Sequence, residues 1–128
     1  YTGWYTLSLH DALPILVRFG GLIGEDRHPV RFLSGRKNVE QPDSPVNLIH
    51  QKDCIGILLT LIEKGIYGEI FNAVAPSHPT RKTYYTKMAL SFGLPLPEFA
   101  AQQNATGKII SSDKIIETLG YDFEVPQL

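Results

Sequence analysis

The sequence lacks the features that mark several specialised protein classes. A single cysteine, Cys54, among 128 residues excludes an internal disulfide framework and a cysteine-rich zinc site. No apolar run approaches the roughly 18 residues of a membrane-spanning helix. Twelve Lys and Arg residues stand against 13 Asp and Glu residues, so the basic surplus of a nucleic-acid-binding protein is missing. These absences favour a cytoplasmic enzyme, or a part of one, with neither a nucleic-acid nor a membrane partner.

The composition that remains is that of a packed domain. Hydrophobic residues make up 43% of the chain and charged residues 20%, which argues against intrinsic disorder. The length suits one domain with a single core. We find no internal repeat and no low-complexity linker.

The first fifteen residues do not have the pattern of a native N-terminal signal. They lack the basic start and the long apolar stretch of a signal peptide, since Arg18 is the first basic residue. Residues 6–15 resemble a translated Illumina sequencing adapter, because the codons ACT CTT TCC CTA CAC GAC GCT CTT CCG ATC encode them in order. We therefore predict that residues 1–15 are non-native and that the genuine protein begins in mid-frame at Leu16. The alternative is a short native amphipathic arm that carries Trp4.

From Leu16 onward, apolar runs alternate with helical patterns. Strands are predicted over residues 16–19, 46–50, 69–74 and 108–110. Helices are predicted over residues 30–33, 53–64, 80–92 and 112–119. The glycine-rich run 20–24 is interpreted as a tight turn. This alternation indicates an α/β fold with a parallel sheet.

Two of these elements have more apolar surface than the rest of the chain is expected to bury. Strand 16–19 is apolar without alternation, which predicts burial on both faces. The helix that follows Asp53, its expected N-cap, is apolar on almost every side and ends at Gly65. About 113 residues offer little material to cover both elements, so we expect part of the molecule to be missing.

The order of these elements resembles the C-terminal part of NAD(P)-dependent epimerase/dehydratases, within the extended or atypical short-chain dehydrogenase/reductase family. The motifs involved are Leu16-Val17-Arg18-Phe19-Gly20-Gly21-Leu22-Ile23-Gly24, Val46-Asn47-Leu48-Ile49-His50-Gln51-Lys52-Asp53, Gly68-Glu69-Ile70-Phe71-Asn72 and Leu119-Gly120-Tyr121 with Pro126. The resemblance implies the C-terminal, substrate-side part of a Rossmann-type fold, incomplete in this chain. Gly21, Ile23 and Glu25 replace the Asn, Tyr and Pro of many nucleotide-sugar enzymes, which favours an atypical branch.

The machinery of such enzymes is absent from the sequence. There is no G-x-x-G-x-x-G turn, which would bring the backbone close to the cofactor pyrophosphate. No Tyr has a Lys four residues later, since Tyr84 is followed by Met88 and Lys87 lies one position short. A Lys so placed would lower the Tyr pKa for proton transfer. We therefore assign no catalytic residue to this chain.

The resemblance implies two sets of site residues. Those at the cofactor edge are Phe19, Gly20 and Gly21. Those at the substrate edge are Leu22, Ile23, Arg27, Asn47 and His50. NAD or NADP is expected in the intact enzyme, together with a small-molecule substrate, while this chain alone should bind no cofactor tightly.

Several single residues have two interpretations. His50 and Asp53 could form an acid/base pair, or could be a strand residue and a helix cap. Arg27, His28 and Arg36 could bind a phosphate or carboxylate, or could form a solvated basic loop. Arg18 should need a partner, because a lone charge in an apolar strand is costly.

Other residues are expected to be structural. Tyr84, Tyr85 and Lys87 are interpreted as an outer helix face, and Cys54 as a small buried hydrophobe. The histidines are too scattered for a metal site.

Three functional hypotheses follow. The first is a substrate-binding C-terminal fragment of an NAD(P)-dependent epimerase/dehydratase-like oxidoreductase, inactive and aggregating or molten alone. The alternative is a self-contained, non-catalytic α/β binding module, for which residues 16–128 would unfold cooperatively. The third is a non-catalytic sensor that once bound NAD(P)H. The sequence does not determine the choice of NAD or NADP, the substrate or the oligomeric state.

Overall fold

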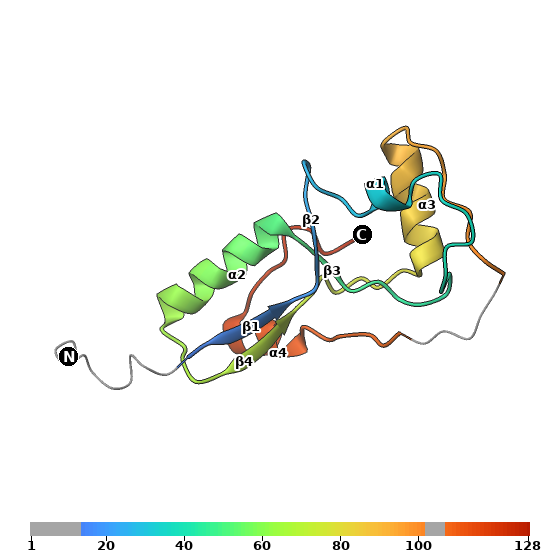
Figure 1. Cartoon of the computed structure of the whole chain (residues 1–128). Coiled ribbons are helices and arrows are strands. Elements are labelled where there is room, and N and C mark those ends of the chain that lie inside the picture. Colours follow the sequence, from blue (N-terminus) through green and yellow to red (C-terminus); the bar gives the residue numbers. More distant parts are fainter. Residues whose placement is uncertain (1–13, 102–106) are drawn as a thin grey trace, which may run out of the picture.

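The computed structural model describes residues 14–101 and 107–128, which contain short strands and helices in alternation (Figure 1). The strands are β1 (Leu16–Phe19), β2 (Gly21–Ile23), β3 (Leu48–His50) and β4 (Ile70–Ala73). The helices are α1 (Val30–Leu33), α2 (Gln51–Lys64), α3 (Arg81–Ser91) and α4 (Asp113–Leu119). The expected adapter-derived segment falls almost entirely on residues 1–13, outside the described residues.

Both strand pairs are parallel, which confirms the predicted α/β class. Strand β1 pairs with β4, placing Leu16 opposite Ile70 and Phe19 opposite Ala73. Strand β2 pairs with β3, placing Gly21 opposite Leu48. The chain thus leaves one parallel pair and enters the other within a few residues.

Gly20 marks this transition, and the prediction of a tight turn over residues 20–24 is wrong. Residues Gly21–Ile23 form strand β2, and the backbone N–H of Gly20 still donates to Ala73 while that of Gly21 donates to Asn47. A Cβ on Gly20 would lie 2.5 Å from the Asn47 carbonyl oxygen and 2.6 Å from Val74 Cγ1. Glycine is needed here because the neighbouring backbone comes so close, and not because the chain turns.

The apolar side chains form two clusters that meet at β3. Ile49 belongs to the cluster with Phe71 of β4 and with buried residues of α2 and α4. Leu48 belongs to the other cluster, with Val30 of α1 and Tyr84 of α3. Successive strand residues point to opposite faces, so this one short strand contributes to both clusters.

The helix ends are only partly as predicted. Gly65 has a left-handed conformation at the C-terminus of α2, as expected. Gly120 has the same conformation at the C-terminus of α4, and Thr80 accepts from Thr83 N–H at the start of α3. The N-cap of α2, however, is His50, whose Nδ1 accepts from Lys52 N–H at 3.1 Å. Asp53 lies inside the first turn, so its predicted capping role is wrong.

Two strand predictions also need correction. Residues 108–110 form no strand; they instead lie beside Asn47, whose side-chain amide donates to Lys108 O and accepts from Ile110 N–H, both at 2.8 Å. Strand β1 is not buried on both faces, since Leu16, Arg18 and Phe19 are exposed. Within the described residues, nothing covers its outer face.

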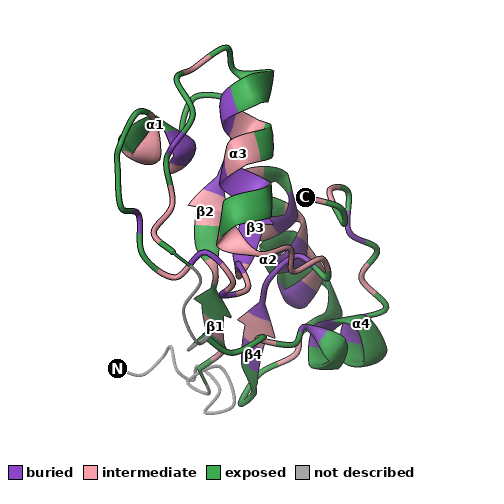
Figure 2. Ribbon diagram, turned by 90° about the vertical axis from the view of Figure 1, so that its right-hand side faces the viewer, coloured by how far each residue is buried: buried purple, intermediate pink, exposed green. Residues whose placement is uncertain are grey.

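Helix α2 is apolar all round but is covered on one side only (Figure 2). Ile57 and Leu61 are buried against the sheet. The opposite side carries exposed apolar side chains at i, i+3, i+4 and i+7 spacing: Ile55, Leu58, Leu59 and Ile62. Over the described residues, no helix is long and apolar enough to cross a membrane.

Candidate functional site

Two neighbouring cavities share His28 as a wall residue. The larger, here the Arg27 cavity, has a volume of about 530 Å³ and is lined by residues that include Gly21, Leu22, Asp26, Arg27, Arg31 and Tyr85. The smaller, here the Tyr84 cavity, has a volume of about 300 Å³ and is lined by residues that include Ile23, Glu25, His50, Tyr84, Lys87 and Leu128. Four of the five substrate-edge residues predicted from the sequence therefore divide between two cavities, and Asn47 lines neither.

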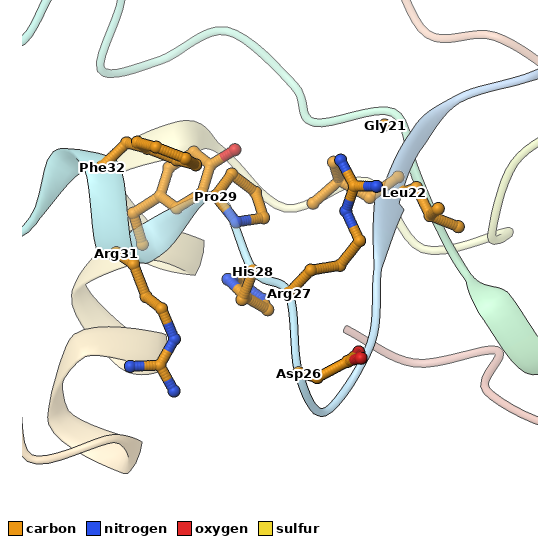
Figure 3. Close-up of a pocket in the computed structure, with 10 residues that line it drawn as sticks. Gly21, Leu22, Asp26, Arg27, His28, Pro29, Arg31 and Phe32 are labelled. Atoms are coloured by element: carbon orange, nitrogen blue, oxygen red, sulfur yellow. The ribbon is translucent and has the colours of Figure 1, made fainter.

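The loop between β2 and α1 shapes the Arg27 cavity (Figure 3). Its ends are joined because Gly24 N–H donates to the Arg27 carbonyl oxygen at 2.9 Å. The Arg27 side chain is exposed and, like Leu22 of β2, lines this cavity (Figure 3). A guanidinium in this position could bind a carboxylate or phosphate oxygen of a ligand.

Arg31 and Arg36 differ from Arg27 in their contacts and in their position relative to the Arg27 cavity. The Arg31 guanidinium lies 5.3 Å from the centre of the Phe92 ring, so it makes a cation–π contact while lining the Arg27 cavity. Arg36 does not line this cavity. Of the three basic side chains predicted as an anion site, the structure brings Arg27 and His28 to one cavity and leaves Arg36 apart.

His28 lines both cavities and forms a buried hydrogen bond with Tyr84, which lines the Tyr84 cavity alone. His28 Nε2 lies 2.7 Å from the Tyr84 hydroxyl oxygen, and His28 Nδ1 accepts from Val30 N–H at 3.1 Å. Burial, together with the nearby Arg31 charge, lowers the pKa of His28 below its ordinary value of 6.5. The imidazole is therefore neutral near pH 7.

The interpretation of Tyr84 and Tyr85 as an outer helix face is wrong. Tyr84 is 1% exposed and Tyr85 is 5% exposed, while Lys87 alone of the three is exposed. With Met88 and Ala89, the two tyrosines have the spacing of an apolar helix face. That pattern was present in the sequence and would have predicted that both tyrosines are buried.

The residues predicted at the cofactor edge also divide. Phe19 and Gly20 line a third cavity of about 210 Å³, together with Arg18 and Lys108, whereas Gly21 lines the Arg27 cavity. The glycine-rich run is a strand leading to a loop, so it offers no helix N-terminus for a pyrophosphate. Arg18 is exposed, so no desolvation makes a partner necessary.

The remaining predicted residues have structural contacts. The Asn47 amide donates one N–H to Lys108 O and accepts from Ile110 N–H at its oxygen. His50 caps α2 and also lines the Tyr84 cavity. Among the described residues, no group of His, Cys, Asp and Glu could hold a metal ion.

Asp53 does not pair with His50 and has a role that was not predicted. Its carboxylate is fully buried and accepts from the Tyr121 hydroxyl at 2.8 Å, Glu124 N–H at 2.7 Å and Val125 N–H at 3.0 Å. These bonds fix the C-terminal segment, and Val125 and Leu128 of that segment line the Tyr84 cavity. Asp53 is thus a positioning residue for the cavity wall.

Comparison with known proteins gives relatives in sequence and in structure. No family model matches the chain. Protein YeeZ of Escherichia coli K12 is 38% identical over 112 residues, which are 87% of this chain and 40% of that protein. The chain therefore spans about two fifths of the length of this curated relative.

Solved structures agree with that coverage. A functionally unknown conserved protein of Silicibacter pomeroyi has a similar structure, and the match covers 88% of this chain and 45% of that protein, at a TM-score of 0.72 and 22% identity. For human epimerase family protein SDR39U1 with NADPH, the match covers 88% of this chain and 44% of that protein, at a TM-score of 0.65 and 23% identity. For Bordetella bronchiseptica WbmG in complex with NAD and UDP, the match covers 96% of this chain and 42% of WbmG, at a TM-score of 0.68 and 15% identity.

The parallel α/β architecture and these neighbours agree with the motifs seen in the sequence. The chain therefore has a parallel α/β fold that matches part of the Rossmann-type fold of these solved structures, among them an epimerase family protein.

Proposed function

We propose that residues 16–128 are the substrate-side, C-terminal part of an NAD(P)-dependent epimerase/dehydratase-like oxidoreductase, and that residues 1–15 are adapter-derived. The observation that carries this proposal is the partial match: most of this chain overlays on less than half of proteins solved with NADPH or NAD. In the intact enzyme the nicotinamide would exchange a hydride with a small-molecule substrate. The Tyr and Lys for proton transfer would come from outside this chain.

In this proposal the Arg27 cavity is the substrate edge. Arg27 and Leu22 would contact the substrate, with Ile23 and His50 behind them at the Tyr84 cavity. Asn47 would hold the 108–110 segment in place at the substrate edge. Phe19 and Gly20, at the exposed end of β1, would form the cofactor edge together with Gly21.

The exposed apolar residues of β1 and α2 support the same proposal. Phe19 is 38% exposed and Ile62 is 68% exposed, although both are large apolar residues in regular elements. Apolar stripes of this kind usually mark a covered surface. We propose that the remainder of a longer protein covers them.

The test compares NADH and NADPH binding by two proteins, the present chain and the product of the full open reading frame. We expect no saturable change in nicotinamide fluorescence with the chain and low-micromolar binding by the longer product. Low-micromolar affinity or turnover by the chain alone would contradict the proposal. A long read of the source DNA through codon 16 defines the longer product and tests the adapter origin directly.

A further inference from the structure

The Tyr84 cavity contains a buried hydrogen-bond donor whose proton is not used within the described residues. Which of the two side chains donates in the His28–Tyr84 hydrogen bond follows from the other partner of His28. Because Val30 N–H donates to His28 Nδ1, that nitrogen carries a lone pair, and the proton of the neutral ring must lie on Nε2. The Nε2–H then donates to the Tyr84 oxygen at 2.7 Å.

The Tyr84 O–H is consequently left to donate elsewhere. No acceptor for it exists among residues 14–101 and 107–128, although the side chain is 1% exposed. Burial raises the pKa of Tyr84 well above its ordinary value of 10, so the phenol keeps its proton at neutral pH. A buried donor without an acceptor is costly, and a ligand oxygen would remove that cost.

We propose that the Tyr84 cavity binds a small apolar molecule that carries a carbonyl or carboxylate oxygen, with that oxygen accepting the Tyr84 O–H. The inference requires no cofactor and does not depend on the proposed hydride transfer, although Ile23 and His50 of the proposed substrate edge line the same cavity. The cavity, at about 300 Å³, is at the small end of the range for ligand sites.

The walls define the rest of the ligand. Ile23, Met88, Phe92 and Val125 supply apolar surface for its body. Lys87 lies three residues after Tyr84 on the same helix face and donates to Leu128 O at 3.0 Å. Its charge favours a ligand oxygen that is negative or strongly polarised, while Glu25 at the same cavity disfavours a second negative group.

The experiment titrates the full chain with three probes by NMR: benzoate, acetophenone and ethylbenzene, which has no acceptor. Three proteins are compared, namely the unmodified chain, Tyr84→Phe, and the matched control Tyr85→Phe, which alters the buried tyrosine lining the Arg27 cavity. We expect Tyr84→Phe to weaken benzoate or acetophenone binding by about three- to tenfold. Tyr85→Phe should leave their affinity unchanged, and ethylbenzene should not distinguish the three proteins.

Each outcome has a stated meaning. A Tyr84-dependent response to acetophenone alone supports a neutral carbonyl ligand, and one to benzoate alone supports a carboxylate. Absence of binding, or equal binding by all three proteins, overturns the inference.

A second measurement remains if Tyr84→Phe fails to fold. The ¹⁵N shifts of the His28 ring in the unmodified chain report which nitrogen carries the proton. A proton on Nε2 supports the inference. A proton on Nδ1 would make Tyr84 donate to His28 and would overturn it.

Discussion

At the scale of single residues, Asp53 has the largest structural role that the sequence did not predict. Three donors converge on its buried carboxylate: the Tyr121 hydroxyl, Glu124 N–H and Val125 N–H. Asp53→Ala should lower the free energy of unfolding by about 3 kcal/mol, because these donors lose a charged acceptor. Urea unfolding followed by circular dichroism measures the change.

The control for that experiment is Asp122→Ala. Asp122 is an exposed carboxylate in the same C-terminal region, so its removal should change the unfolding free energy by less than about 0.5 kcal/mol. Equal losses from the two variants would argue against an anchoring role for Asp53.

His28 should make stability depend on pH. Its pKa is lowered in the folded protein by burial and by Arg31, so below pH 6.5, its ordinary pKa, the unfolded chain binds the proton first. The His28 contribution is thus fully present above pH 6.5 and is lost as the pH falls from there toward the lowered folded-state pKa. We expect the unfolding midpoint in urea to fall over this window, and to fall less in His28→Gln. An unchanged slope in the variant would assign the effect to other groups.

At the scale of elements, the junction of β1 and β2 depends on Gly20. An added Cβ would meet the Asn47 carbonyl oxygen at 2.5 Å, and backbone cannot move away as a side chain can. Gly20→Ala should therefore cost about 1–3 kcal/mol in unfolding free energy, measured in urea. At Gly107 an added Cβ would meet Pro45 and Ser44 at 3.4 Å, an ordinary contact, so Gly107→Ala is the matched control. Indistinguishable midpoints for the two variants would contradict this account of the junction.

The sequence predicted most elements but not their environments. The strand at residues 16–19 and the helix begun by Thr80 were recognisable because their signals are local: apolar runs, caps and terminal glycines. The close approach at Gly20 depends on residues 27 and 54 positions away, so a glycine cluster suggested a turn instead.

The same limit applies to the site. Arg27 and Leu22 were identified from the family resemblance, and both line a cavity. The pairing of His28 with Tyr84 joins residues 56 positions apart and leaves no local pattern. Asp53 has the residue type and position of a cap, and only the distant C-terminal segment reveals its actual role.

At the scale of the whole molecule, the exposed stripe on α2 should govern association. Ile55, Leu58, Leu59 and Ile62 form one continuous apolar face of the helix. We expect the chain alone to self-associate with increasing concentration, observed by light scattering. The double variant Leu59→Glu, Ile62→Glu should remain monodisperse with unchanged circular dichroism, because both side chains are already exposed.

The control for this prediction is a pair of charges placed elsewhere. Leu90 and Leu96 are exposed apolar residues outside α2, so Leu90→Glu with Leu96→Glu adds the same charge and leaves the stripe intact. If both double variants reduce self-association equally, the effect comes from net charge and not from the stripe on α2.

The pairing of strands has a consequence for how the chain folds. Gly21 and Leu48 are 48 − 21 = 27 positions apart, whereas Leu16 and Ile70 are 70 − 16 = 54 positions apart. Closing the longer loop costs about 0.6 kcal/mol more entropy, since its length is doubled. Pairing of β2 with β3 is thus about threefold more probable as the first event, and the late pairing of β1 with β4 leaves that edge open to other chains during synthesis.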